Sequence, residues 1–201
     1  MNARTHEASG ETPVATFWKR ALPAYTGRGT QHIGKSRTYG WFGKNGEIVT
    51  KRRTKVMAIS SGGGHWVQML RLMPAFEGCE VVFATVHEGY RFQVGDHAFR
   101  TIPDANRWDK ASVVRSAFRV FCLVICERPD VVITTGAAPG YFAIVFGKVL
   151  GARTVWLDSI ANAEKLSLSG KMVEWCADLW LTQWPHLSQD KKGPAFYGKV
   201  L

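Results

Sequence analysis

The residues best suited to chemistry lie in one short stretch, ISSGGGHWVQ, at residues 59–68. Glycine has no Cβ, so backbone N–H groups in such a stretch can approach a ligand closely. A helix is expected to begin near His65, and the N-terminus of a helix attracts anions. The candidate phosphate-binding residues are Ser61, Gly62, Gly63 and Gly64. His65 is the candidate catalytic base, because imidazole can donate to phosphate or accept a proton near neutral pH.

Two familiar nucleotide-binding motifs are absent from this stretch. No lysine follows the glycines, which argues against the P-loop of ATP- and GTP-binding proteins. A dinucleotide fingerprint needs a glycine where Val67 stands and an acidic residue at the end of the second strand, for which Glu88 is a poor substitute. Two simpler interpretations stay open: a tight turn without a ligand, and a histidine that bonds only to the backbone at a helix start.

Further candidate residues follow later strands of the chain. The segment TTGAAPG at 134–140 supplies Thr135 and Gly136, which we expect to join the same phosphate site. Asp158 ends another strand and is either a weaker candidate base or a cap for the turn that follows. Three residues in other loops are candidates for the substrate side: Asn106, Arg107 and Asn162. Around residue 107 a plain helix start, with Asp109 as its N-cap, is an equally good interpretation.

These residues need a scaffold, and from residue 55 onward apolar runs alternate with helical patterns. Six runs are predicted as strands: 56–60, 80–85, 99–103, 130–135, 153–158 and 178–183. Four segments are predicted as helices: 65–74, 109–128, 141–151 and 171–177. The segment 136–140, GAAPG, is predicted as a turn. Continuous apolar strands between helices indicate an α/β fold with a doubly wound, Rossmann-like parallel sheet, whose ligands bind beyond the carboxyl ends of the strands.

The first part of the chain differs in composition from the rest. The net charge is +10, and residues 1–55 hold 11 Lys and Arg against 3 Asp and Glu. We expect residues 1–54 to form a basic, partly ordered arm and residues 55–201 to form the Rossmann-like domain. Within the arm, residues 40–53 predict a hairpin with its turn at Asn45 and Gly46. A basic arm attracts phosphate-rich partners or is simply solvated, and no nucleic-acid-binding motif accompanies it.

The cysteines and the hydropathy of the chain indicate where in the cell the protein is located. None of the four cysteines has zinc-site spacing, so we expect no metal and reduced thiols in the core. They are Cys79, Cys122, Cys126 and Cys176. The N-terminus lacks the apolar stretch of a secretory signal, and the longest uncharged run, 131–147, is shorter than a membrane span of about 20 residues. These features predict a cytoplasmic protein without a transmembrane helix.

Several long segments resemble the bacterial Alg-fourteen-like (PssD-type) polysaccharide biosynthesis family, over about residues 55–201. They are VMAISSGGGHWVQMLRL, IPDANRWDK, ERPDVVITTGAAPGYFAIVFGKVLGARTVWLDSIAN and SLSGKMVEWCADLWLTQWPHL. The resemblance implies the N-terminal, acceptor-binding half of a MurG-like GT-B glycosyltransferase. MurG-type enzymes carry a Gly-rich loop ending in histidine, which matches Gly62, Gly63, Gly64 and His65. Their second Gly-rich loop matches 135–140, where this chain has alanines.

The resemblance also implies a function. The protein is expected to be one subunit of a two-subunit inverting glycosyltransferase in exopolysaccharide or capsule biosynthesis. An Alg-thirteen-like partner subunit is expected to hold the UDP-sugar, and this chain to hold a polyprenyl-diphosphate-linked acceptor. No cofactor is implied. Only 147 residues follow the arm, fewer than two Rossmann-like halves require.

A peripheral position on the cytoplasmic face of the inner membrane is implied as well. Phe118 and Phe121, with Arg115 and Arg119, are candidates for bilayer contact. Ordinary core packing of this helix is the alternative. For the whole protein, the alternative function is a non-catalytic scaffold that recruits the partner to the membrane.

Overall fold

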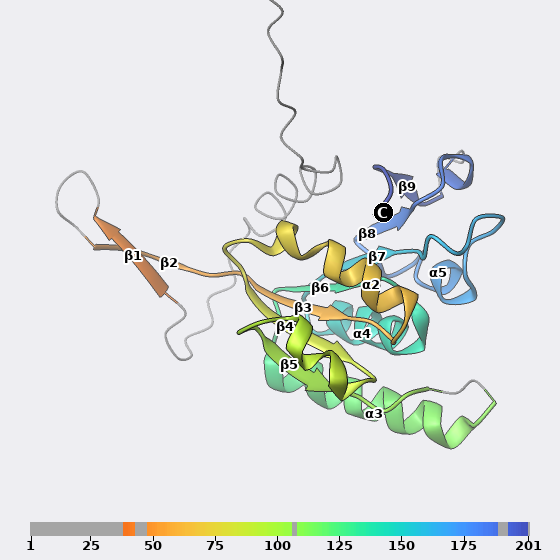
Figure 1. The fold of residues 1–201 in the computed structure, drawn as a ribbon, viewed down its shortest axis with the longest axis horizontal. Coiled ribbons are helices and arrows are strands. Elements are labelled where there is room, and N and C mark those ends of the chain that lie inside the picture. The colour runs from red at the N-terminus through yellow and green to blue at the C-terminus, as the bar shows by residue number, and fades with distance from the viewer. Residues whose placement is uncertain (1–37, 43–47, 106–107, 189–192, 201) are drawn as a thin grey trace, which may run out of the picture.

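A seven-stranded parallel sheet forms the centre of the protein (Figure 1), as the sequence predicts. The computed structural model describes residues 38–42, 48–105, 108–188 and 193–200. The sheet has the order β5-β4-β3-β6-β7-β8-β9. Its strands are β3 (Lys55–Ile59), β4 (Glu80–Thr85), β5 (Ala98–Thr101), β6 (Val131–Thr134), β7 (Arg153–Leu157), β8 (Leu179–Thr182) and β9 (Ala195–Phe196). The chain moves outward from β3 to β5 and then returns to β6 beside β3, so the switch point lies between β3 and β6.

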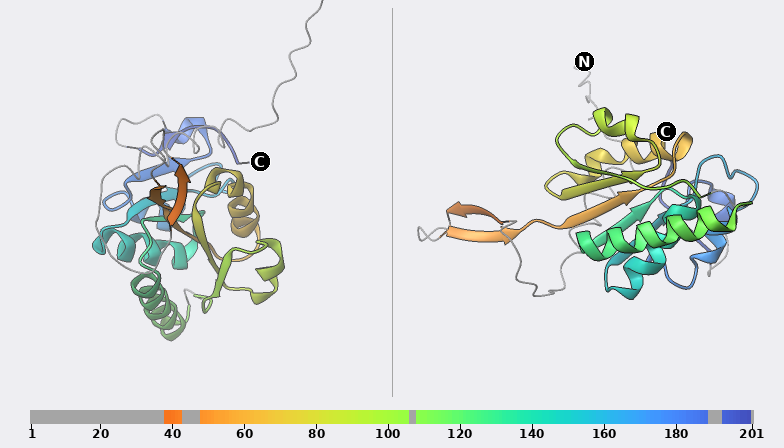
Figure 2. Two further views of the ribbon diagram at one scale, coloured as in Figure 1. Left: turned by 90° about the vertical axis from the view of Figure 1, so that its left-hand side faces the viewer. Right: turned by 90° about the horizontal axis from the view of Figure 1, so that it is seen from below.

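Helices cover both faces of this sheet. The helices are α2 (Gly64–Arg71), α3 (Lys110–Glu127), α4 (Ala137–Val149) and α5 (Leu168–Met172). Three 3₁₀ turns connect elements: η1 (Met73–Phe76), η2 (Glu88–Gln93) and η3 (Pro185–Ser188). Helix α2 packs on one face, and α3 and α4 lie together on the other (Figure 2).

Strand β3 shows why the predicted strands are continuous apolar runs. All five of its residues are buried. Val56 and Ala58 pack in the core beneath α2, whereas Met57 and Ile59 pack in the core beneath α3 and α4. Successive side chains of a strand point to opposite faces, so a strand covered on both faces needs apolar residues at every position. Full burial of each large side chain stabilises the fold by about 1.5–3 kcal/mol.

Several element boundaries differ from those predicted. Helix α2 ends at Arg71, and Pro74 lies in the 3₁₀ turn η1 rather than closing the helix. The predicted turn GAAPG is wrong, because these residues from Ala137 onward form the first turn of α4. Proline is tolerated in the first turn of a helix, where an N–H has no intrahelical acceptor. Helix α5 is shorter and earlier than predicted, and β9 and η2 were not predicted.

Helix α3 buries only part of its apolar surface. Ser116, Val120 and Val124 are buried against the sheet. Phe118 is 63% exposed and Val114 67% exposed, while Phe121 and Ile125 are also exposed. The side chain of Asp109 accepts a hydrogen bond from the backbone N–H of Ala111 at 3.0 Å, so it is the N-cap of this helix. Ordinary core packing therefore does not account for the whole apolar face of α3.

The four cysteines are free thiols, but the prediction that all lie in the core is wrong. Cys176 is buried, Cys79 and Cys122 are half-buried, and Cys126 is exposed on α3. The exposure of Cys126 has the same cause as that of Ile125: this flank of the helix faces away from the sheet. Burial raises the pKa of the Cys79 and Cys176 thiols, which keeps them protonated and unreactive.

A separate hairpin precedes the domain. Strand β1 (Thr38–Phe42) pairs antiparallel with β2 (Ile48–Arg52), with Phe42 opposite Ile48, as the sequence predicts for this region. The predicted turn residues, Asn45 and Gly46, lie outside the described residues. Figure 1 shows the hairpin projecting from the sheet along the direction of β3. The boundary between arm and domain near residue 54 stays a prediction.

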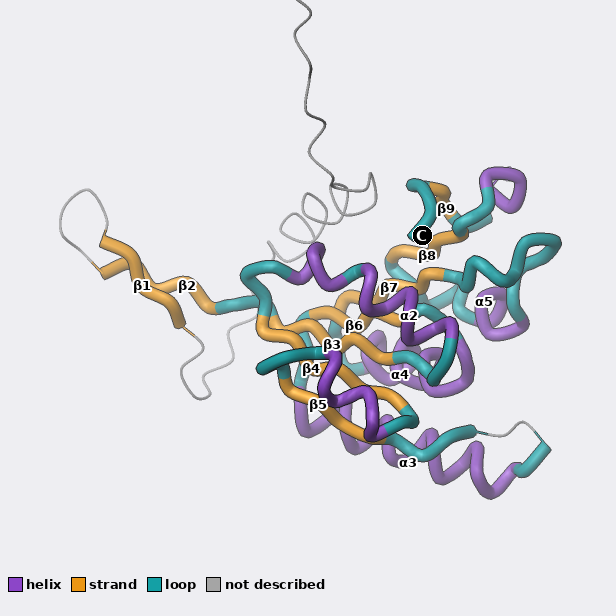
Figure 3. Tube along the Cα trace, viewed as in Figure 1, coloured by secondary structure: helices purple, strands orange, loops and turns teal. Residues whose placement is uncertain are grey.

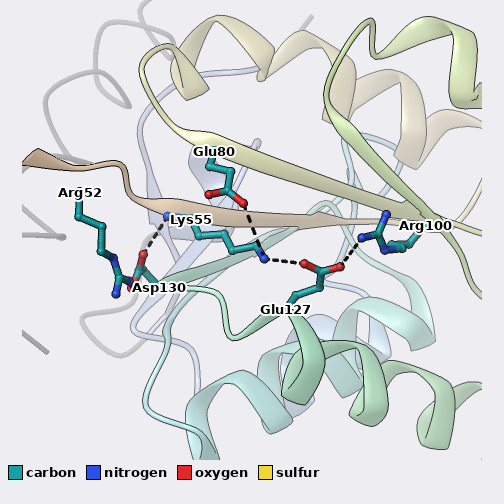
Figure 4. A network of polar contacts seen from close by, with 6 residues as sticks. All are labelled: Arg52, Lys55, Glu80, Arg100, Glu127 and Asp130. Carbon is teal, nitrogen blue, oxygen red and sulfur yellow. Dashed lines mark hydrogen bonds and ion pairs between the residues drawn. The ribbon is translucent and has the colours of Figure 1, made fainter. Parts of the chain in front are cut away.

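Charged side chains gather around Lys55, the first residue of β3 (Figure 4). Lys55 is only 3% exposed, and its Nζ lies 2.5 Å from Glu127 Oε2 and 3.8 Å from Glu80 Oε1. Glu127 also pairs with Arg100 at 2.7 Å. Burial raises the pKa of Glu127, but the hydrogen bonds and charges of Lys55 and Arg100 outweigh it and lower the pKa below its ordinary value. We call Lys55, Glu80, Arg100 and Glu127 the amino-edge network.

Candidate functional site

The predicted site residues meet at the opposite edge of the sheet, where the strands end. Figure 3 shows the connections that leave β3, β6 and β7 at this edge. Strands β3 and β6 are neighbours, with Ile59 in register with Thr134. Their connections to α2 and α4 are joined by two reciprocal hydrogen bonds between His65 and Thr135. Nδ1 of His65 lies 2.7 Å from the backbone oxygen of Thr135, and the Thr135 hydroxyl donates to the backbone oxygen of His65 at 2.7 Å.

These bonds fix the tautomer of His65. A carbonyl oxygen can only accept a hydrogen bond, so Nδ1 carries the proton and a neutral ring leaves the lone pair on Nε2. No hydrogen bond to Nε2 comes from the part of the chain that the structure describes. His65 is half-buried and therefore presents an oriented, basic nitrogen to a ligand. This is the geometry that a general base requires.

Gly136 allows this placement of the imidazole. A Cβ at residue 136 would lie 2.8 Å from Cε1 and 3.0 Å from Nδ1 of His65. Gly136 also has φ = 123°, a conformation that other residues rarely adopt, and Ala137 follows with φ = 68°. The backbone N–H of Gly136 donates to Thr134 Oγ1 at 3.1 Å. Consecutive residues with positive φ mark this turn as a strained position of the kind that concentrates at functional sites.

The Gly-rich loop forms the start of α2. Gly63 is the N-cap of this helix with φ = 64°, and no side chain caps it. The backbone N–H of Gly63 donates to the Tyr90 hydroxyl at 3.2 Å, so this donor is occupied. The N–H groups of Gly64 and His65 occupy the first helical positions, which have no intrahelical acceptor. No acidic residue lies in the first turn, and the helix N-terminus therefore offers positive potential to an anion.

Two residues near this loop were missed in the sequence. His87 and Tyr90 follow β4, and Tyr90 stacks on Trp66 of α2 with a centroid separation of 5.2 Å and an interplanar angle of 6°. The His87 ring lies against Gly62, where a Cβ would be 2.7 Å from Nε2. The signal was the segment VHEGY directly after a predicted strand, at the edge where ligands bind. This segment lacks helical or strand periodicity, and in the sequence it offers Glu88 only as a poor acidic candidate.

Asp158 lies at the end of β7 and is 1% exposed. Its carboxylate accepts hydrogen bonds from the Ser167 hydroxyl at 2.6 Å, the Ser167 N–H at 2.9 Å and Asn162 Nδ2 at 3.3 Å. The Ser167 hydroxyl in turn accepts from the N–H of Gly170 and caps α5. The structure thus brings Asp158 and Asn162 together, and both act on the loop between β7 and α5. Asn106 and Arg107 lie outside the described residues.

A chain of buried amides connects the loop to the C-terminal segment. Gln68, one turn after His65, donates to the backbone oxygen of Gly64 and to Ser159 Oγ, both at 3.1 Å. Its Oε1 accepts from Gln183 Nε2 at 2.5 Å, and Gln183 Oε1 accepts from the N–H of Val200 at 2.8 Å. Because these side chains are almost fully buried, losing one partner would leave a costly unpaired group. The network holds α2, and with it His65, against the end of β8.

The described residues hold neither a metal-binding cluster nor a membrane-spanning helix. No group of three or more His, Cys, Asp or Glu side chains in the described ranges is arranged to hold a metal ion. Across those same residues, every helix is too short or too polar to cross a bilayer.

Comparison with known proteins gives one family. Residues 99–200 match the family described as "Oligosaccharide biosynthesis protein Alg14 like". The UDP-N-acetylglucosamine transferase subunit ALG14 of Mus musculus is 32% identical over 191 residues, covering 77% of this chain and 86% of the relative. The subunit of the same name from Eremothecium gossypii is 27% identical over 178 residues, covering 73% and 80%.

Solved structures share the fold. MurG of Acinetobacter baumannii superposes with a TM-score of 0.57 at 13% identity, covering 71% of this chain and 45% of MurG. UDP-N-acetylglucosamine 2-epimerase of Rickettsia bellii superposes with a TM-score of 0.54 at 13% identity, covering 67% and 40%. The chain thus spans less than half the length of these two proteins, and the likeness at this identity concerns the fold alone.

Proposed function

Since the chain belongs to the Alg14-like family of oligosaccharide biosynthesis proteins, we propose that it is the acceptor-binding subunit of a two-subunit inverting glycosyltransferase. The partner is an Alg-thirteen-like subunit that holds the UDP-sugar. The acceptor is a sugar carried on a polyprenyl diphosphate. The names of the relatives support this proposal, since they are subunits of UDP-N-acetylglucosamine transferases. A PssD-type role in exopolysaccharide or capsule synthesis is the finer form of the proposal.

The observation that carries the proposal is the oriented imidazole of His65 beside the N-terminus of α2. The diphosphate of the acceptor binds at the N–H groups of Gly64 and His65. Nε2 of His65 takes the proton from the acceptor hydroxyl while that oxygen attacks the anomeric carbon of the donor sugar. The bond to UDP breaks, UDP leaves with the electron pair, and the anomeric centre inverts. A positioned base of this kind contributes roughly 10²–10⁴-fold to a rate.

The other candidate residues take supporting parts. Thr135 and Gly136 place the imidazole, one through its backbone oxygen and hydroxyl and the other by leaving room for the ring. Asp158 holds the loop before α5, since its two oxygens already accept three hydrogen bonds. We therefore prefer His65 to Asp158 as the base.

Membrane attachment belongs to the same proposal. The exposed stripe of α3 consists of Val114, Phe118, Phe121 and Ile125. Arg115 and Arg119 are exposed beside it. An apolar stripe flanked by arginines suits the boundary between acyl chains and anionic headgroups. We propose that α3 rests on the cytoplasmic face of the inner membrane, close to the lipid-linked acceptor.

A single substitution tests the role of His65. In His65→Asn the amide nitrogen takes the place of Nδ1 and keeps the bond to Thr135, but the basic nitrogen is lost. We expect kcat of the variant, assayed with the partner, a UDP-sugar and a lipid-linked acceptor in vesicles, to fall by roughly 10²–10⁴-fold. The unfolding midpoint should stay close to that of the wild type, because the loops remain joined. Wild-type turnover in this variant would exclude the base role.

A non-catalytic scaffold is the second candidate, because the bonds between His65 and Thr135 also fasten two loops together. The partner alone, assayed on a water-soluble acceptor, separates the two. A scaffold predicts full turnover by the partner alone, whereas the base role predicts almost none.

A further inference from the structure

A second imidazole and a phenol flank the Gly-rich loop on the side of β4, and the mechanism above uses neither. His87 and Tyr90 lie at the start of η2, next to the end of β4, which neighbours β3 in the sheet. His65 lies at the far end of the same loop and contacts Gly136 of the next connection. The loop from Gly62 to His65 is therefore bounded by one imidazole at each end.

The Tyr90 hydroxyl is set up to donate a hydrogen bond. It accepts from the backbone N–H of Gly63 at 3.2 Å, which uses a lone pair and leaves its own proton available. The ring is held firmly, because it stacks on the buried Trp66, whose Nε1 donates to Gln93 at 2.6 Å. The phenol thus has a fixed ring and a proton without an acceptor among the described residues, immediately beside the first turn of α2.

The His87 imidazole has ring contacts but no hydrogen bond among the described residues. It lies edge-to-face against Tyr90 with a centroid separation of 5.3 Å and an interplanar angle of 80°. Its Nε2 occupies the space that a side chain at Gly62 would fill. His87 is exposed, so packing does not explain why a polar ring lies on this loop. The ring can donate a hydrogen bond to a ligand that reaches the loop.

A buried hydroxyl lies at the base of the same loop. Ser60 is 0% exposed, and its Oγ has no hydrogen-bond partner within the described ranges. Buried polar groups are normally paired, and an unpaired one needs a reason such as an absent ligand or ion. Together with Tyr90 and His87, this makes three polar side chains with unused hydrogen-bonding capacity at or beside one Gly-rich loop.

We infer that His87 and Tyr90 form a second wall of the anion site and bind a diphosphate together with the N–H groups of Gly64 and His65. The diphosphate oxygens accept from the Tyr90 hydroxyl and from the His87 imidazole, across the loop from His65. Naming the lipid-linked acceptor as the source of this diphosphate rests on the proposed function, whereas the wall itself does not. UDP is the other source with the same chemistry, and the second experiment below distinguishes the two.

The first experiment titrates the full chain with inorganic pyrophosphate by calorimetry. We expect His87→Leu and Tyr90→Phe, each of which removes the donor, to weaken binding by roughly 10–100-fold, as expected for loss of one hydrogen bond to a charged group. Phenylalanine keeps the stack on Trp66, and His87 is exposed, so the thermal midpoints should match the wild type. The control is His186→Leu, which removes another exposed imidazole, bonded to the backbone of Ala163. Three results would overturn the inference. They are wild-type affinity in both test variants, an equal loss of affinity in the control, and no pyrophosphate binding by the wild type.

The second experiment adds the partner and measures KM for both substrates. Loss of the second wall should raise KM for the lipid-linked acceptor by a similar factor, with KM for the UDP-sugar and kcat changing by less than about twofold. A rise only in KM for the UDP-sugar would overturn the acceptor as the source. If the wild-type pair transfers no sugar but the pyrophosphate losses persist, the proposed function fails and the second wall stands. If transfer is normal and neither KM changes, the second wall fails and the function stands.

Discussion

The two edges of the sheet use polar residues in opposite ways. At the amino edge, the buried Lys55 lies between Glu127 and Glu80, and Glu127 also pairs with Arg100. At the carboxyl edge, the N–H groups of Gly64 and His65, Nε2 of His65 and the proton of Tyr90 have no hydrogen-bond partner among the described residues. Paired charges hold elements together, whereas unpaired donors and acceptors are available to a ligand. The amino edge thus holds the fold together, whereas the carboxyl edge contains the residues that we propose bind the substrate.

Among the variants that compare the two edges, the largest effect on the rate is expected from adding a side chain at Gly136, at the carboxyl edge. In Gly136→Ala, the new Cβ would lie 2.8 Å from the His65 ring at a backbone φ of 123°. The ring must move, and misplacement of a catalytic group by about 1 Å costs on the order of 10²-fold in rate. We expect kcat to fall by about 100-fold, measured with the partner and a lipid-linked acceptor.

Gly151→Ala is the matched control for this change. Gly151 also has positive φ, at 83°, but a Cβ there meets no atom within 4 Å. It should show the backbone strain alone, about 1 kcal/mol of lost stability, with the rate intact. An equal loss of rate in the two variants would show that strain, rather than the imidazole, is responsible.

The next largest effect belongs to the amino edge. Glu127→Gln removes the carboxylate that pairs with the buried Lys55. We expect the free energy of unfolding in urea to fall by about 2–3 kcal/mol, less than for complete loss of a buried pair, because Glu80 remains near Lys55. The specific activity of the folded protein should not change, since this edge is remote from the site. A large loss of kcat with little change in stability would refute the division between the edges.

The same residue gives the amino edge a pH dependence. The folded-state pKa of Glu127 lies below its ordinary value, so its stabilisation is fully present above the unfolded pKa of about 4.3. It is lost as the pH falls through the lower, folded-state pKa. The difference in unfolding free energy between wild type and Glu127→Gln should therefore shrink below about pH 4.3. A difference that stays constant down to pH 3 would show that the charge of Glu127 contributes nothing.

The sequence predicts the sheet well because the pattern that indicates each strand lies within the strand itself. Val56, Met57, Ala58 and Ile59 are apolar without alternation, and this requires burial on both faces. The loop from Gly62 to His65 is equally local, since its glycines precede a helix that begins at once. The sequence predicts a turn where α4 begins because glycine and proline usually break helices, whereas both are tolerated at a helix start.

The features that the sequence does not predict depend on contacts between residues far apart in the chain. His65 and Thr135 are 70 residues apart, and only the pairing of β3 with β6 brings them together. Tyr90 gains its place from Trp66, again through a contact that spacing does not reveal. On α3 the apolar arc is wider than the contact with the sheet, and packing alone decides that Val120 is buried and Phe118 exposed.

A smaller effect is expected at Asp158, which is buried like Lys55 of the amino-edge network but lies at the carboxyl edge. In Asp158→Asn one oxygen becomes an N–H₂ group that faces the N–H or hydroxyl of Ser167. We expect a loss of about 1–2 kcal/mol in the free energy of unfolding. We expect kcat to fall by less than about tenfold. A fall as large as that of His65→Asn, at unchanged stability, would instead make Asp158 the base. Rate and stability measured on the same preparations decide between the two.

The smallest effect on the fold concerns α3, where neighbouring residues differ in what they face. Phe118 is exposed and Val124 is buried on the same helix. Phe118→Ser should leave the thermal midpoint within about 2 °C, yet weaken binding to vesicles containing anionic lipids by roughly 5-fold, since part of an aromatic side chain leaves the apolar layer. Val124→Ser should do the opposite, because it places a hydroxyl in the core without changing the exposed stripe. If Phe118→Ser binds vesicles as the wild type does while losing affinity for the partner subunit, the exposed stripe of α3 is a protein interface rather than a membrane contact.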